Sequence, residues 1–386
     1  MNGKLFKYWN RVRSGFWFVP AVMAGVAVAL ALVSVTVDEP LAEWLALNLG
    51  WRFAGGAEGA SAVLGIVAGS MITVAGVVFS MTLVALSLAS SQLGPRLLRN
   101  FMRDSTTQVV LGTFIATFLY CLIVLRTIRR PEEVAFVPHL SVTLGVLLAV
   151  ASVGVLIYFI HHVSVSIQAN EVAARISKEL IERIDHLFPE HIEGAPTIPT
   201  EPSDVGSFEV SDKDARPVGA AKDGYLQFID GEALLALAVK EDLVVRLEQR
   251  TGNYVVASCP LATIWPGSRV TDRLADQIRS LFVLGHQRTS DQDIEFGVNQ
   301  LVEIAVRALS PGLNDPFTAI TCVDNLGSVL SRLVKRDVPS HYRHDHQHEL
   351  RVIATPNTFH QVADAAFNQV RQYSGSSVAV TLRLLD

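Results

Sequence analysis

The sequence is poor in cysteine, and the three that it contains, Cys121, Cys259 and Cys322, are far apart. No CxxC pair or short, regular cysteine spacing occurs, so the pattern excludes a disulfide-stapled scaffold and a zinc ribbon. Cys121 falls within an apolar run. The other two fit a reducing compartment such as the bacterial cytoplasm.

The sequence also lacks the short motifs of common enzyme classes. It contains no phosphate-binding loop of the GxxxxGK[ST] type, no HExxH and no GxSxG. The net charge is −5, and no basic run outside the flanks of the apolar stretches is large enough to bind nucleic acid. We therefore expect no enzyme activity, no cofactor and no nucleic-acid partner.

Long hydrophobic runs are what the sequence has in excess: 50% of the residues are hydrophobic, and they concentrate in the first 165 or so. Four runs approach or exceed the roughly 20 apolar residues that cross a bilayer, and they contain almost no carboxylates, which argues against a proton-coupled carrier. The first run is too long for a cleavable signal peptide and lacks a clear cleavage site. The predicted spans are about 15–37, 61–91, 108–125 and 139–160, within a transmembrane domain of residues 1–162.

The positive charges predict the orientation of these spans, because short cytoplasmic loops are rich in Lys and Arg. Four basic residues precede the first span, and Arg96, Arg99 and Arg103 follow the second. The loop between the first two spans is acidic. This alternation places both termini in the cytoplasm, although Arg126, with two more arginines after it, runs against the rule.

The remainder of the chain reads as an aqueous α/β (mixed α+β) domain. An amphipathic helix is predicted for 163–187, and it packs either against copies of itself as a neck or on the domain that follows. A Pro- and Gly-containing linker covers 188–216 and a cytoplasmic domain covers 217–386. Its pattern predicts strands at "YLQFI", "DLVVRLE" and "YVVAS", several helices, and a final strand at "SVAVTLRLL".

Two polar segments in this domain are candidate sites. In "SPGLNDP", Ser310, Asn314 and Asp315 fit a helix stop, a turn and a helix cap, with a ligand or interface role as the alternative. In "HYRHDHQHE", His341, His344 and His346 could ligate a metal, but the segment lies between elements, so a solvated loop is the preferred interpretation. The pair His161–His162, which ends the fourth span, either senses protons or anchors the span at the membrane interface.

The second span carries the most informative pattern. At 100° per residue, Gly65, Gly69, Thr73, Gly76, Ser80, Ser87 and Ser91 fall on about a quarter of the helix surface, a set that we call the hydroxyl stripe. Val84 lies close to the stripe. Thr82 lies on the far side, where its hydroxyl can bond to a backbone carbonyl one turn earlier. Small residues at this spacing allow tight helix packing, and a hydroxyl-bearing face also suits a water-filled path; both interpretations stay open.

With these residues in view, the chain resembles the bacterial DUF2254 family of predicted membrane proteins. The resemblance is carried by "SQLGPRLLRNFMRDSTTQVVLGTFIATFLYCLIVLR" and "QDIEFGVNQLVEIAVRALSPGLNDPFTAITCVDNLG", and "GYLQFID" supports it. It implies an N-terminal membrane region and a C-terminal cytoplasmic domain, and it carries no established activity.

The leading functional hypothesis is an oligomeric ion channel or pore-like protein of the bacterial inner membrane. In it the second span lines the path and Arg96, Arg99 and Arg103 ring the cytoplasmic mouth, while the soluble domain gates the path. The lipid bilayer, other copies of the chain and ions are then the expected partners. The expected lining residues are Thr73, Gly76, Ser80, Val84, Ser87 and Ser91. The alternative is a membrane-anchored sensor or scaffold whose domain binds a ligand or partner without transport.

Overall fold

The computed structural model describes residues 17–49, 56–94, 104–128, 138–189, 214–355 and 357–386. The chain divides into two compact units, Met1–Gln168 and Ala169–Asp386. We call the described part of the first the membrane unit and the second the C-terminal domain. Arg96, Arg99 and Arg103, the expected cytoplasmic mouth, lie outside the described residues, as do the linker residues 190–213.

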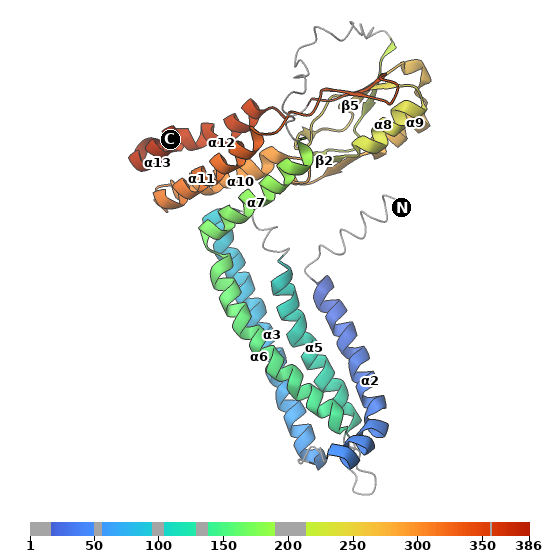
Figure 1. Ribbon diagram of the computed structural model, residues 1–386, viewed down its shortest axis with the longest axis vertical. Coiled ribbons are helices and arrows are strands. Elements are labelled where there is room, and N and C mark those ends of the chain that lie inside the picture. Colours follow the sequence, from blue (N-terminus) through green and yellow to red (C-terminus); the bar gives the residue numbers. More distant parts are fainter. Residues whose placement is uncertain (1–16, 50–55, 95–103, 129–137, 190–213, 356) are drawn as a thin grey trace. The chain divides into compact units, whose positions relative to one another are not determined.

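The membrane unit consists of long apolar helices, and four of them have the length and composition of a membrane span. A helix is present at each of the four predicted spans, and each of these helices ends beyond the predicted C-terminal residue (Figure 1). The helices are α2 (Phe18–Leu49), α3 (Gly56–Leu93), α5 (Ser105–Thr127) and α6 (His139–Ser166). With 38 residues, α3 is about 57 Å long. It is therefore longer than the roughly 30 Å of hydrocarbon in a bilayer.

Helix α5 packs against each of the other three spans. Close approach depends on two glycines, because a Cβ atom at Gly112 would lie 2.5 Å from the sulfur of Met23. A Cβ atom at Gly145 on α6 would likewise lie 2.9 Å from Leu64 on α3. Small residues inside the membrane unit thus mediate tight helix contacts.

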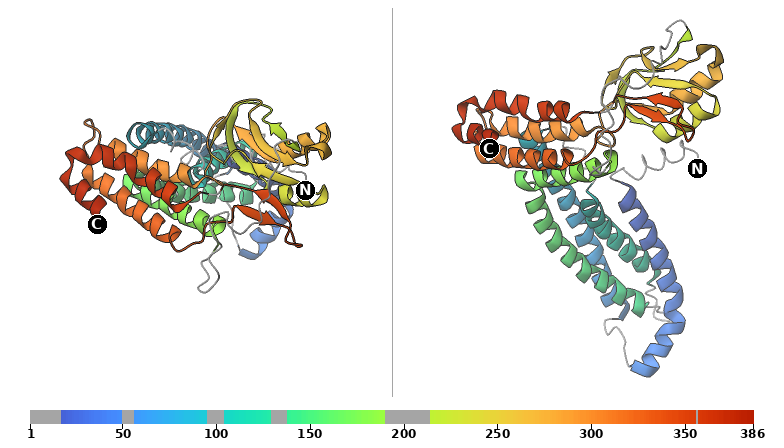
Figure 2. Two further views of the ribbon diagram at one scale, coloured as in Figure 1. Left: turned by 90° about the horizontal axis from the view of Figure 1, so that it is seen from above. Right: turned by 45° about the horizontal axis from the view of Figure 1, so that its top comes forward.

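The C-terminal domain combines two small sheets with nine α-helical or 3₁₀ segments among its described residues (Figures 1 and 2). The strands are β1 (Arg216–Gly219), β2 (Gly224–Ile229), β3 (Val244–Leu247), β4 (Tyr254–Val255), β5 (Pro260–Trp265), β6 (Phe282–Gly285), β7 (Tyr342–His344) and β8 (Leu350–Ile353). The helical segments are α7 (Ala169–Leu187), α8 (Gly231–Lys240), η4 (Gly267–Arg269), α9 (Asp272–Ser280), α10 (Ile294–Ala308), α11 (Pro316–Leu333), α12 (Phe359–Tyr373), η5 (Ser374–Ser376) and α13 (Val378–Leu385).

One sheet has the strand order β1-β5-β3-β8-β7 and the other β4-β2-β6. All strand pairs are antiparallel except β3 with β8. A single apolar core joins both sheets to α8 and α9 through residues such as Leu226, Ile264, Leu234 and Ile278. The strands predicted at "YLQFI", "DLVVRLE" and "YVVAS" form β2, β3 and the short β4.

The other helices form a bundle in which α7 packs on α10 and α11. Gly297 on α10 permits this contact, since a Cβ atom there would lie 2.5 Å from Leu180 on α7. Both oxygens of the Asp185 carboxylate accept hydrogen bonds from Arg332 on α11, and Arg336 donates a third at 2.7 Å. The apolar face predicted for 163–187 therefore lies on the protein's own domain.

Three local predictions need correction. Residues 163–166 end α6, and the amphipathic helix begins only at Ala169, after a break at Ile167. The predicted final strand is helix α13, because buried Val380 anchors it as a helix and Arg383 bonds to Asp324 on α11. The predicted histidine loop contains strand β7, which pairs with β8.

Candidate functional site

The hydroxyl stripe lies on the exposed side of α3 within one chain. All seven of its residues are exposed, and so is Val84, with 66% of its surface accessible. The buried side of α3, which contains Met71, Ala75 and Val78, is centred roughly 150° around the helix from the centre of the stripe. A Cβ atom added at Gly65, Gly69 or Gly76 would meet no atom within 4 Å. The contacts that hold α3 in the membrane unit therefore leave the stripe uncovered.

The stripe hydroxyls fall into two groups. Thr73 donates to the carbonyl of Gly69 at 2.8 Å and Ser91 to that of Leu88 at 2.9 Å, so these hydroxyls are satisfied by their own helix. Ser80 and Ser87 make no hydrogen bond to any of the described residues. Thr82, on the other side, bonds to the carbonyl of Val78 at 2.8 Å, as predicted.

A buried carboxylate joins the ends of two spans, and sequence reasoning missed it because Asp38 was assigned to a loop. Asp38 on α2 is 1% exposed. Its oxygens accept from the backbone N–H groups of Leu140 and Ser141 at 3.1 and 2.8 Å, and from the Ser141 hydroxyl at 2.7 Å. Asp38 thus caps the N-terminus of α6 from a distant helix. The only signal in the sequence is an acidic residue directly after an apolar run.

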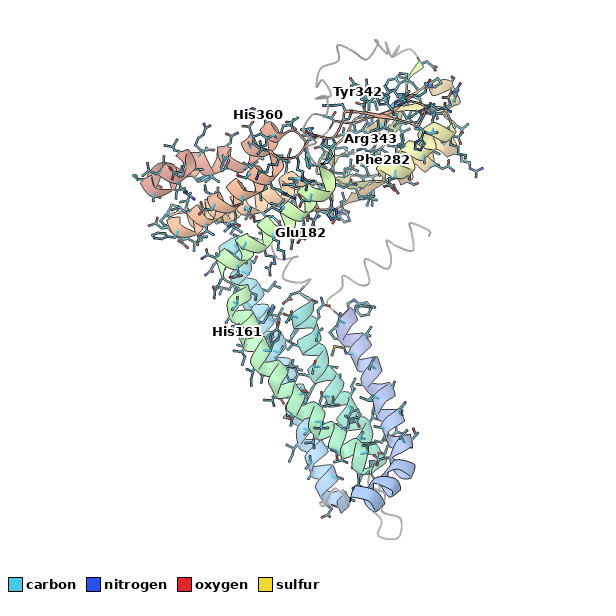
Figure 3. The ribbon with its side chains drawn as sticks, in the orientation of Figure 1. His161, Glu182, Phe282, Tyr342, Arg343 and His360 are labelled. Atoms are coloured by element: carbon cyan, nitrogen blue, oxygen red, sulfur yellow. The ribbon has the colours of Figure 1, made fainter. Side chains whose placement is uncertain are left out.

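A second aspartate contacts α6 near its C-terminal end. Asp104, just before the α5 span, lies 2.7 Å from Nε2 of His162 and also accepts from Thr107 and from the backbone of Thr106. Burial raises the pKa of Asp104, but the hydrogen bonds from His162 and Thr107 outweigh it, and the net shift is downward. His161, labelled in Figure 3, is exposed. The structure therefore separates the two histidines that the sequence analysis treated together.

In the C-terminal domain, Ser310, Asn314 and Asp315 occupy the turn between α10 and α11. The Ser310 hydroxyl donates to the carbonyl of Arg307, and Asn314 has a φ of 47°, in the left-handed region. Asp315 caps α11 through Thr318, and this side-chain hydrogen bond lowers its pKa. All three therefore have the stop, turn and cap geometry that their sequence predicts.

The histidine segment is a hairpin. His341 precedes β7, His344 ends it, and His346 lies in the turn before β8. Among the described residues, no three His, Cys, Asp or Glu side chains come together in a way that could hold a metal ion.

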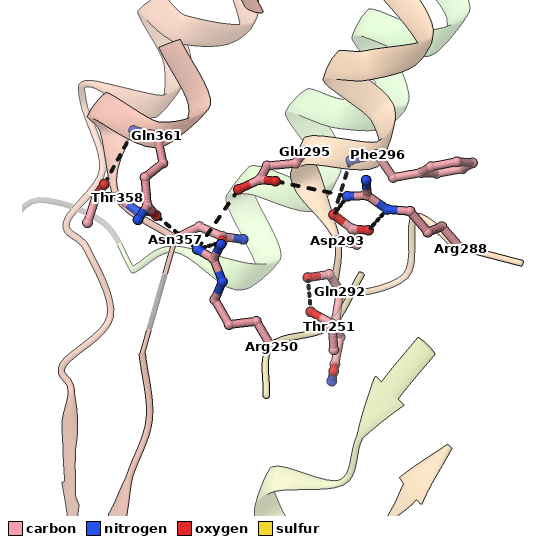
Figure 4. Close-up of polar contacts among 10 residues, drawn as sticks. All are labelled: Arg250, Thr251, Arg288, Gln292, Asp293, Glu295, Phe296, Asn357, Thr358 and Gln361. Atoms are coloured by element: carbon pink, nitrogen blue, oxygen red, sulfur yellow. Dashed lines mark hydrogen bonds and ion pairs between the residues drawn. The ribbon is translucent and has the colours of Figure 1, made fainter. Parts of the chain in front are cut away.

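A polar cluster that the sequence analysis missed lies where α10 and α12 begin (Figure 4). Arg288 donates to both oxygens of Asp293, which is 2% exposed in its side chain and caps α10. Arg250 donates to the side-chain oxygens of Asn357 and Gln361 at the start of α12. Glu295 lies 4.0 Å from both guanidinium groups. The cluster connects loops of the sheet region to the first turns of two helices, so its evident role is to join these parts.

With this geometry established, the comparisons with known proteins identify the family. The profile described as "Predicted membrane protein (DUF2254)" matches residues 13–386. The chain is a member of the DUF2254 family. This confirms the resemblance noted in the sequence.

Proteins of similar sequence occur in mycobacteria. The chain is 35% identical over 381 residues to the uncharacterized protein Mb1321c of Mycobacterium bovis and to the uncharacterized protein Rv1290c of Mycobacterium tuberculosis. Each alignment covers 97% of this chain and 71% of the relative. No solved structure matches the chain. The family description thus supports location in a membrane, and function must be argued from the geometry.

Proposed function

We propose that this DUF2254 protein is an oligomeric channel of the bacterial inner membrane, with both termini in the cytoplasm. In the proposed assembly, each subunit turns the hydroxyl stripe of α3 toward a shared path. The lining then consists of Thr73, Gly76, Ser80, Val84, Ser87 and Ser91. The C-terminal domain is the proposed gate.

The observation that supports this proposal is the direction of the stripe. If the chain were a lone subunit, these hydroxyls and glycines would face acyl chains. An unpaired hydroxyl in hydrocarbon is costly, and glycines offer little surface for contact with lipid. Ser80 and Ser87 lack partners within the described chain, so water or a neighbouring subunit is the physical alternative.

The experiment is flux through purified protein in liposomes, with Ser80→Leu as the decisive variant. A leucine at this position should narrow and dewet the path, and we expect flux to fall by about tenfold or more while the oligomer stays intact. Met81→Leu is the matched control. It lies at the same depth, is 47% exposed and falls outside the stripe, so its flux should equal that of the wild type. The absence of ion flux through the wild-type protein under every gradient tested would contradict the proposal.

A second candidate is a membrane-anchored scaffold in which the stripe packs dry against another subunit. The uncovered pair Gly65 and Gly69 favours it, because two glycines four residues apart let helices approach closely. Ser80→Leu separates the two functions. In a dry bundle it should break the oligomer, whereas in a channel it should spare the oligomer and stop the flux.

A further inference from the structure

The contact between Asp104 and His162 connects the start of α5 to the last turns of α6 at one end of the membrane unit. Nε2 of His162 lies 2.7 Å from Oδ2 of Asp104, and the two side chains are 24% and 25% exposed. A carboxylate oxygen accepts only, so Nε2 must carry hydrogen. The same carboxylate caps α5 through the backbone of Thr106. Asp104 therefore holds the start of one span and the end of another.

Among the residues that the structure describes, few other ionisable groups lie near this contact. On α6, Tyr158 stacks on the ring of His162 at 6.0 Å, and His161 is exposed. The neighbouring α3 carries no ionisable side chain from Gly59 to Gly94, and α2 carries none from Phe18 to Val37. Within the described part of the membrane unit, His162 is thus the one imidazole that meets a carboxylate.

The position of the contact matters because α6 leads directly into the C-terminal domain. Helix α6 ends at Ser166, four residues after His162, and α7 begins at Ala169. Only Ile167 and Gln168 separate the end of α6 from the start of α7.

We propose that the Asp104–His162 contact is pH-sensitive. It orders the last turns of α6 when His162 is protonated, and these turns become less ordered when His162 is neutral. In the protonated state the hydrogen bond joins two opposite charges, the imidazolium of His162 and the carboxylate of Asp104. In the neutral state Nε2 still donates to the ionised carboxylate of Asp104, but the attraction between two opposite charges is lost. Imidazoles in general change charge within the physiological range. The proposal does not depend on conduction through α3.

The test is amide hydrogen exchange of the full-length protein in a lipid nanodisc, at about pH 6 and about pH 8.5. Protection is corrected for the intrinsic effect of pH on exchange. We expect the last two turns of α6 to be roughly five- to tenfold better protected at the lower pH. The middle of α5, far from the contact, should show no such change.

Three variants test whether the Asp104–His162 contact causes the pH dependence of the protection. His162→Gln keeps a donor but no titratable group, and it should abolish the pH dependence. His161→Gln, the matched control on the adjacent residue, should retain it. Asp104→Asn can still cap α5, and it should reduce the dependence because the negative charge is gone. A wild-type protein without pH dependence, or a His162→Gln variant that keeps it, overturns the proposal.

Discussion

Individual aspartates define the ends of the membrane helices. Asp38 and Asp104 are both hydrogen-bonded to backbone N–H groups at the first turn of a span, where four donors have no partner within the helix. A helix N-terminus also favours negative charge. These carboxylates therefore serve helix termini, and they do not mark an ion site inside the bundle.

Asp38→Ala should destabilise the membrane unit by about 2 kcal/mol, because it removes a cap and leaves one buried and one partly buried N–H group unpaired. Asp38→Asn should cost less, since an amide oxygen can still accept. Thermal unfolding in detergent measures the change. The control is Thr36→Ala, whose hydroxyl is exposed and bonds only to its own helix, and which should be nearly neutral. Equal effects of Asp38→Ala and Thr36→Ala would contradict the capping role.

Gly252 is a second residue whose identity the tertiary structure dictates. Its φ is +94°, and a Cβ atom there would lie 2.3 Å from Oδ2 of Asp293. We expect Gly252→Ala to lower the free energy of unfolding of the C-terminal domain by about 2 kcal/mol or more. Gly327→Ala is the opposite case. It lies within α11 with no atom within 4 Å, and alanine should stabilise by up to ~1 kcal/mol. Denaturant titration checks both signs.

At the scale of elements, the attachment of α7 to its domain depends on an ion pair as well as on apolar packing. The hydrogen bond from Arg332, and the charges of Arg332 and Arg336, hold the pKa of Asp185 below its usual value. A depressed carboxyl pKa means that the folded state gains stability above the pKa of the unfolded chain. That gain is lost as the pH falls through the folded value.

Acidification should therefore weaken the attachment of α7 to its domain, and this acid effect should be smaller in the Asp185→Asn variant. We expect the wild-type protein to lose protection of α7 as the pH falls below about 4, whereas the variant should already be weaker at neutral pH and change less. Hydrogen exchange of residues 169–187 provides the measurement. The reverse order, with a larger acid effect in the variant, would show that another group is responsible.

Helix α13 is an element whose type the sequence pattern predicted wrongly. In "SVAVTLRLL", apolar residues alternate with smaller or polar ones and several residues are β-branched, a pattern that predicts a strand. In the structure only Val380 is fully buried, while Val378 and Leu385 are 76% and 80% exposed. One buried anchor and the ion pair of Arg383 with Asp324 decide the conformation. Local propensity is too weak to compete with such contacts.

At the scale of the whole molecule, the chain consists of two units with separate cores. The apolar cluster of the sheets and the bundle of α7 and α10–α13 lie within Ala169–Asp386. A fragment of residues 169–386 should therefore be soluble without detergent and unfold cooperatively in a calorimeter. Aggregation of this fragment, or a broad transition without a heat-absorption peak, would mean that the domain needs the membrane unit to fold.

The sequence by itself determined the membrane spans, the division into two halves and the cap of α11. Each of these follows from a local signal: a long apolar run, a change in composition, or an Asp-Pro pair at a helix start such as Asp315 and Pro316. The hydroxyl stripe was also visible, because helical periodicity alone places its residues on one side.

Only the tertiary structure decided which neighbours those residues meet. It turned the stripe away from the other spans, buried Asp38 against the start of a helix about one hundred residues later, and chose His162 over His161 as the partner of Asp104. Periodicity fixes the angle of a side chain about its own helix axis. The rotation of that helix against its neighbours depends on packing summed over many residues far apart in the chain.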